Sequence, residues 1–90
     1  MDFIVVHCGW RHIGKLYHLG MVVRFNKNVY VFEFKVVELS PEGRALQQIK
    51  DKGYAKPYLA IGEPVHMIGV EFSKANRSVV GFEVELLFNQ

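Results

Sequence analysis

Cysteine, proline and an excess of charge of one sign are all scarce in this 90-residue sequence. The single cysteine, Cys8, cannot form an internal disulfide, which excludes a disulfide-stapled fold and indicates a reducing compartment such as the cytoplasm. Three prolines and 22% charged residues do not describe a disordered chain. A net charge of +2 is compatible with nucleic acid binding, but the sequence lacks the clustered basic stripe of a dedicated electrostatic binder.

Long hydrophobic runs are also lacking. The apolar run 3–6 follows Asp2 without a basic region, so neither a signal peptide nor a membrane span is indicated, and no membrane partner is expected. Half of the residues are nevertheless hydrophobic, in a chain long enough to bury only about 60–65% of its unfolded surface. We therefore expect another subunit or domain to cover part of the apolar surface, with a homodimer as the default.

Four stretches have the composition of β-strands, and they lie on either side of one helical stretch. The strand patterns cover residues 21–25, 29–39, 65–72 and 79–88, and a further apolar run at 3–8 is compatible with a strand. Between the strands, residues 42–52 form a helical pattern. The order strand, strand, helix, strand, strand predicts a mixed sheet with a helix on one face, an α/β or α+β fold.

The turn and helix boundaries have recognisable residues. Asn26-Lys27-Asn28 predicts a hairpin turn, since asparagine tolerates positive φ. Ser40 and Pro41 predict the N-cap and first position of the helix, and Gly53 predicts its end. In the last strand, Phe82, Val84 and Leu86 alternate with polar residues, and we expect these three to face the core.

The strand at 29–39 contains an acid and a base in an otherwise apolar run. Successive strand side chains point to opposite faces, so Glu33 and Lys35 share a face, about 7 Å apart, with Val29, Val31 and Val37. The opposite face is wholly apolar, and we expect it to pack on the core or the helix. It consists of Tyr30, Phe32, Phe34 and Val36.

Two interpretations of this pair stay open on the residues alone. A bare E-x-K on a strand is more often a surface ion pair worth under about 1 kcal/mol. Alternatively, Glu33 is a ligand for Mg²⁺, which prefers carboxylate oxygens, and Lys35 orients a water and offsets phosphate charge. Other basic residues near the helix and the last turn would either touch phosphates or form a solvated face. These are Arg44, Lys50, Lys52, Lys56, Lys74 and Arg77.

Three stretches together resemble a known family. VYVFEFKV, ALQQIKDKGYAKPYLA and HMIGVEFSKANRSVVGFEVE are similar to the PD-(D/E)XK nuclease-like domain at the C-terminus of bacterial AAA-ATPase-like proteins, over residues 21–85. The resemblance implies a restriction-endonuclease-like core and Mg²⁺- or Mn²⁺-dependent hydrolysis of DNA. By position it makes Glu33 the metal ligand and Lys35 the catalytic lysine. It also brings Gln48 and Tyr54 near the site; their other interpretation is a surface amide and a packing aromatic.

The sequence departs from that family in two places. Gly20 stands where relatives carry a metal-binding Asp, and the segment before the first strand does not resemble the helix that relatives have there, so residues 1–90 are interpreted as one partial domain. Asp2, His18 or Glu38 would be the replacement ligands, and spacing selects none of them. Two hypotheses follow: a catalytically degenerate nuclease, or a non-catalytic module that kept the fold and pairs with itself or another protein.

Overall fold

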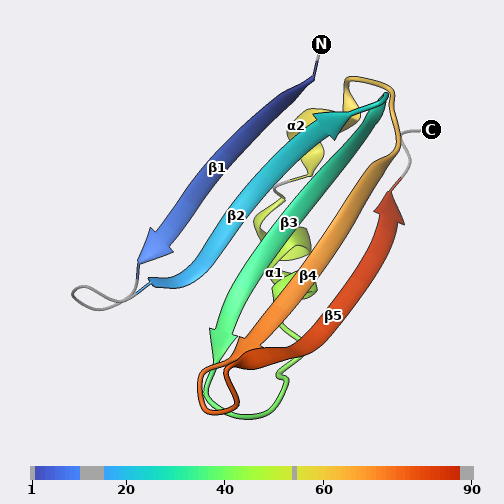
Figure 1. Ribbon diagram of the computed structural model, residues 1–90. Coiled ribbons are helices and arrows are strands. Elements are labelled where there is room, and N and C mark those ends of the chain that lie inside the picture. Colours follow the sequence, from blue (N-terminus) through green and yellow to red (C-terminus); the bar gives the residue numbers. More distant parts are fainter. Residues whose placement is uncertain (1, 11–15, 54, 88–90) are drawn as a thin grey trace.

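The computed structural model describes residues 2–10, 16–53 and 55–87, which form one five-stranded sheet with two short helices on one of its faces (Figure 1). The helices are α1 (Ala45–Lys52) and α2 (Lys56–Leu59). Neither helix is long and apolar enough to cross a membrane. The strands are β1 (Phe3–Trp10), β2 (Leu16–Phe25), β3 (Asn28–Val37), β4 (Val65–Ser73) and β5 (Ser78–Leu87).

The strands lie side by side in the order of the sequence, β1-β2-β3-β4-β5. Neighbouring strands are antiparallel except β3 and β4, which are parallel. The segment with α1 and α2 carries the chain from the end of β3 back to the level of its beginning, where β4 starts. The predicted mixed sheet of the α/β class is thus confirmed. It is one strand larger than the predicted order, since the run that begins at Phe3 pairs with β2.

The β2–β3 hairpin confirms the predicted turn. Asn26 and Lys27 have φ of 53° and 61°, the left-handed conformation that a two-residue hairpin turn requires at both central positions. The side-chain amide of Asn28 donates to the carbonyl oxygen of Asn26 over 3.0 Å. This turn sets the register in which Gly20 pairs with Glu33.

Helix α1 begins later than the sequence predicts. Its N-cap is Arg44, with no side-chain capping bond, so the prediction that Ser40 caps the helix was wrong. A buried carboxylate from β4, that of Glu71, accepts the backbone N–H groups leading into the helix instead. The predicted end is confirmed, because Gly53 adopts φ 66° and its N–H bonds back to the last turn.

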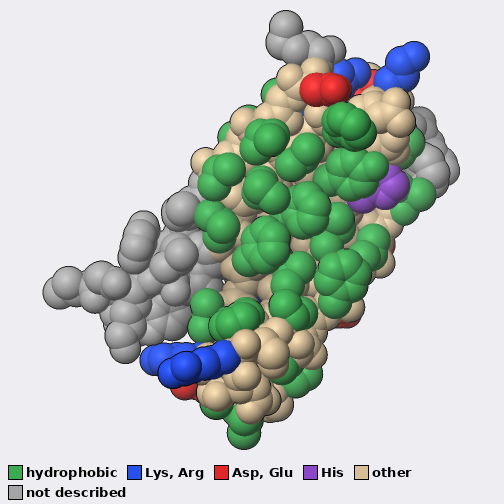
Figure 2. Space-filling model, in the orientation of Figure 1, with side chains coloured by type: hydrophobic (Ala, Val, Ile, Leu, Met, Phe, Trp, Pro, Cys, Tyr) green, Lys and Arg blue, Asp and Glu red, His purple; other side chains and the backbone are tan. Residues whose placement is uncertain are grey.

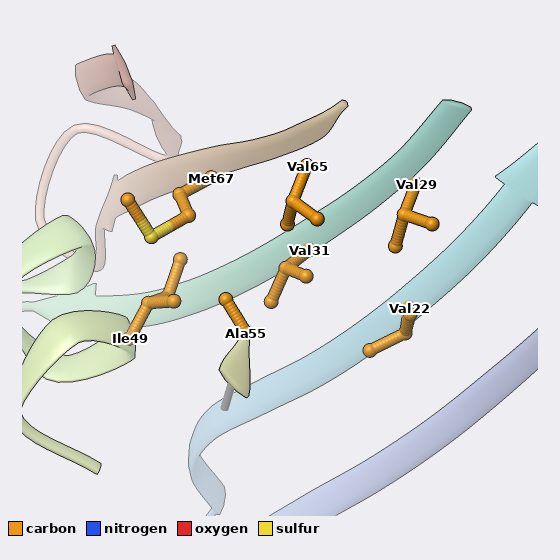
Figure 3. Close-up of a cluster of buried hydrophobic side chains, with 7 residues drawn as sticks. All are labelled: Val22, Val29, Val31, Ile49, Ala55, Val65 and Met67. Carbon is orange, nitrogen blue, oxygen red and sulfur yellow. The ribbon is translucent and has the colours of Figure 1, made fainter. Parts of the chain in front are cut away.

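The hydrophobic core lies between the sheet and the two helices. Valines of β2, β3 and β4 point toward Ile49 of α1 and toward Ala55, which lies just before α2 (Figure 3). Phe3 of β1 packs on this cluster beside Tyr58 of α2, with ring centroids 6.2 Å apart. The side of β3 that bears Val29, Val31 and Glu33 therefore faces the helices.

The other face of the sheet carries no helix in the part of the chain that the structure describes, and two predictions fail there. One face of β3 was expected to meet the core or the helix, but it lies on the side away from α1; it carries Tyr30, Phe32, Phe34 and Val36. Phe82, Val84 and Leu86 were expected to point inward, yet 65%, 54% and 43% of their surfaces are exposed. Alternation defined the two faces of each strand but not which face the helices cover.

Candidate active site

Glu33 is a carboxylate buried in the middle of the sheet, on the helix side. None of its surface is exposed. Its partners across the two neighbouring strands are both glycines, Gly20 on β2 and Gly69 on β4. Side chains directly opposite on neighbouring strands share a face, so neither neighbouring strand places a side chain of its own directly beside Glu33.

Gly69 also brings α1 close to the sheet. A Cβ atom built at this position would collide with the backbone nitrogen of Leu46 in the first turn of α1. Only glycine permits this approach. The helix therefore lies directly over the part of the sheet that holds Glu33, and this burial explains the unusual titration of the carboxyl group.

Burial raises the pKa of Glu33 from 4.5 to about 7. Desolvation disfavours the ionised carboxylate, and the positive charges of Lys35 and Lys52 offset part of this effect. A carboxyl group with a pKa near neutrality on one face of a strand with a lysine is not the solvated surface pair of the simpler interpretation. Perturbed groups of this kind concentrate at functional sites, although structural networks also produce them.

An open pocket of about 400 Å³ lies between β3 and α1, and Lys35, two residues beyond Glu33 on the same face of β3, lines it. Its wall contains three cationic side chains, those of Lys35, Arg44 and Lys52. Asp51 is the acidic residue of the lining, and its carboxylate accepts a 2.8 Å hydrogen bond from Gln47. The excess of positive charge and the amide donors in the wall suit an anion such as a phosphate group.

Glu71 fixes the segment that leads into this pocket. One of its carboxylate oxygens accepts the backbone N–H groups of Glu42 (2.7 Å) and Gly43 (3.0 Å), and the other accepts that of Arg44 (2.8 Å). Desolvation by itself would raise the pKa of Glu71, but the backbone hydrogen bonds outweigh it and leave the pKa lowered. The carboxylate thus stays ionised and ties the start of α1 to β4.

The structure brings together most of the residues expected at the site. Glu33 and Lys35 share a face, and Gln48 lines the pocket beside Lys35. Tyr54 lies outside the described residues. Of the basic residues near the helix, Arg44 and Lys52 line the pocket, whereas Lys50 makes a 3.1 Å ion pair with Glu85 away from it.

Sequence reasoning missed the contributions of Gln47, Asp51 and Glu71. Gln47 and Asp51 are one turn apart on α1, and this spacing could have indicated that both reach the same side of the helix. No local signal marks Glu71, because it acts on backbone groups 27 to 29 positions earlier in the chain.

The described residues do not supply a full set of Mg²⁺ ligands near Glu33. Among the described residues, no three His, Cys, Asp or Glu side chains gather closely enough to hold a metal ion. Two of the replacement ligands left open by the sequence are not at the site. Asp2 lies 3.6 Å from Arg24, about 13 Å along β2 from Gly20, and Glu38 is exposed beyond the end of β3. The side chain of His18 is outside the described part.

The position opposite Glu33 is therefore informative. Gly20 is buried, has no positive φ, and is the β2 partner of Glu33. A side chain there would have its Cβ about 4.5–5.5 Å from that of Glu33, close enough for two carboxylates to share one cation. The location suits the second acid of a nuclease site, and glycine supplies no ligand.

The domain is a mixed sheet whose central strand carries an acid and a lysine on one face. The crossover helix lies over that face and adds a glutamine. This arrangement is that of a nuclease-like α/β domain. The family comparison agrees. Residues 17–82 match the model of the PD-(D/E)XK nuclease superfamily, and this chain belongs to that superfamily. Nucleases of the superfamily generally use divalent metal ions.

The chain is similar to an uncharacterized protein in the vnfD 5′ region of Azotobacter chroococcum mcd 1. The two are 67% identical over 69 residues, which are 77% of this chain and 13% of that protein. The chain thus spans a small part of the relative's length. No solved structure matches it.

Proposed function

We propose that this domain binds the phosphodiester backbone of DNA at the pocket under α1, at a site descended from metal-dependent hydrolysis and now catalytically degenerate. Glu33 is the metal ligand of that ancestral site and Lys35 its catalytic lysine. The observation that carries the proposal is the buried Glu33 carboxylate on the same face as Lys35, which lines a pocket rich in positive charge.

The side chains have distinct roles in this proposal. Lys35, Arg44 and Lys52 attract a phosphate and neutralise its charge, and the amide of Gln48 donates to a phosphate oxygen. The family resemblance also assigns Tyr54 to the site. In an intact relative, Mg²⁺ or Mn²⁺ would polarise the phosphate and lower the pKa of a bound water. Here one carboxylate cannot hold that ion well, so hydrolysis by this chain is expected to be very slow.

The DNA-binding part is tested without metal. Fluorescence anisotropy with a labelled duplex in EDTA should show that Lys35→Ala and Lys52→Ala each weaken binding roughly 10-fold and reduce the salt dependence by about one phosphate contact. Lys50→Ala is the matched control, because Lys50 lies on the same helix but pairs with Glu85. Equal effects of all three substitutions would point to diffuse charge attraction and contradict the pocket.

The catalytic part is tested by restoring the missing acid. Gly20→Asp should increase Mn²⁺ affinity, measured by calorimetry, and should bring plasmid cleavage in Mn²⁺ or Mg²⁺ above that of the natural sequence. Adding Glu33→Gln to Gly20→Asp should abolish both gains. If Gly20→Asp gains no Mn²⁺ affinity, the two positions do not form a metal site. Cleavage by the natural sequence that survives both Glu33→Ala and Lys35→Ala would place the chemistry elsewhere.

A non-catalytic module that associates with itself or with another protein is the second candidate. The observation that favours it is the large apolar face of the sheet opposite the helices. Self-association and the pocket are compatible, because they use opposite faces of the sheet.

A further inference from the structure

The face of the sheet opposite the helices, called the open face below, is apolar across all five strands. A row of paired positions crosses it at its centre: Val6, Met21, Phe32, Ile68 and Val84. The rows on either side continue the pattern with aromatic and branched side chains. Figure 2 shows hydrophobic side chains over the middle of this face, with charged side chains gathered at its two ends.

The polar groups on the open face satisfy each other. In the row next to the central one, His66 of β4 is the cross-strand partner of Tyr30 of β3. Its Nε2 lies 3.0 Å from Oδ1 of Asn28. The His66 ring stacks on Tyr30 with centroids 4.7 Å apart, and Phe32 stacks on Phe34 at 5.8 Å. These stacked rings make an ordered surface, so little side-chain entropy would be lost when a partner covers it.

The open face is about as large as one side of a stable interface. Strands of eight to ten residues at about 3.3 Å per residue, five strands wide at about 4.8 Å spacing, give a footprint of roughly 750 Å². A standard interface buries about 800 Å² on each partner. Soluble monomers rarely expose contiguous apolar patches beyond about 300–600 Å².

A second copy of this chain suits the open face better than a charged partner does. The described positions of the central row and its neighbours contain no Asp, Glu, Lys or Arg, so two identical faces meet without charge repulsion and leave no charge buried. Pairing at the edge strands β1 or β5 would lengthen the sheet but leave the open face uncovered. Face-to-face packing of two copies removes it from water.

We propose that two copies of this chain pack open face to open face about a two-fold axis, as a sandwich of two sheets. Paired sheets lie about 10 Å apart, and each copy's helices then form the outer layers. The pocket lined by Lys35 and α1 then lies on the outer side of each copy in this dimer. This inference goes beyond the proposed DNA binding, and it stands or fails independently of it.

The test is sedimentation equilibrium of the full chain over about a hundredfold range of concentration. We expect a species of twice the 10.4 kDa chain mass for the natural sequence. Val84→Lys places a charge in the central row and should give a monomer, whereas Glu83→Lys, one residue earlier on the opposite face, should leave the dimer intact. Circular dichroism checks that both variants are folded, which is expected because Val84 and Glu83 are exposed.

A second measurement does not depend on the variants. Hydroxyl-radical footprinting of the natural sequence should show Phe82 and Phe32 protected at high concentration and oxidised on dilution. A monomer at all concentrations would overturn the proposal, as would a dimer that persists in Val84→Lys or leaves Phe82 equally oxidised throughout. Loss of DNA binding in Lys35→Ala with an unchanged dimer would confirm that the two faces act separately.

Discussion

Glu33 makes the stability of the domain depend on pH in an unusual direction. Its pKa rises from 4.5 in the unfolded chain to about 7 in the folded one, so the folded state binds more protons between these values. The favourable contribution is complete below pH 4.5 and is lost as the pH rises through 7. The shift corresponds to about 3 kcal/mol of unfolding free energy.

The first prediction concerns this residue. In metal-free buffer, Glu33→Gln should stabilise the domain at pH 8 by up to about 3 kcal/mol and should change little at pH 4.5, because the amide needs no proton to stay neutral. Urea unfolding at the two pH values measures the difference. Glu38→Gln is the control, since Glu38 is exposed. An equal effect at both pH values would mean that Glu33 is not desolvated when folded.

The second prediction concerns Gly69. Gly69→Ala should destabilise the domain by about 1–3 kcal/mol or more, because the new methyl group meets the backbone of Leu46 and α1 has to move away. Gly81→Ala is the matched comparison on the next strand. Its Cβ would meet side-chain atoms of Glu71 at 3.1 and 3.2 Å, a milder overlap than the collision with the Leu46 backbone at Gly69, so a smaller loss is expected. Thermal unfolding of both variants tests this order.

At the scale of elements, the position of α1 depends on Glu71. Its lowered pKa means that this contribution is present above pH 4.5 and is lost as the pH falls through the lower folded value. The segment that Glu71 holds carries Arg44 into the pocket wall. Stability and the pocket are therefore linked through one carboxylate.

The third prediction follows from that link. Glu71→Gln replaces one accepting oxygen by an NH2 group that cannot accept, and it should cost about 1.5–3 kcal/mol of unfolding free energy. It should also weaken the proposed DNA binding at a pH where the variant is still folded, because Arg44 is no longer held in place. Glu83→Gln, an exposed position on β5, serves as the control. Unchanged affinity in a destabilised Glu71→Gln would show that the pocket does not depend on this contact.

At the scale of the whole molecule, the sheet has one face covered by helices and one that is not. If the open faces pair, folding and association are coupled, since a partner that binds only the folded chain stabilises it by mass action. The two pockets would then lie on opposite sides of one particle.

The fourth prediction is that the melting temperature rises with protein concentration. A dimer melts at higher temperature when its protomers are more concentrated, and calorimetry over about a hundredfold range measures the trend. Val84→Lys should remove the dependence and Glu83→Lys should retain it. A melting temperature independent of concentration in the natural sequence would contradict face-to-face pairing.

Local pattern was sufficient for a good part of this protein. Strand alternation placed Glu33 and Lys35 on one face, the Asn26-Lys27 turn identified the hairpin, and Gly53 marked the end of α1, because each depends on residues within a few positions in the chain. The family resemblance rested on the same short stretches. It made Gly20 the position of the absent acid, and the register places Gly20 opposite Glu33.

Which face of the sheet meets the helices could not be read from the strands, since both faces of β3 are rich in apolar side chains. The packing of a distant element settles it: Gly69 lets α1 approach on the side that bears Val29, Val31 and Glu33. Three features follow from the packing of α1 on that face: Glu33 is buried, Glu71 accepts hydrogen bonds from the start of α1, and Phe82 is exposed. Each depends on contacts between residues far apart in the chain, and no local pattern encodes them.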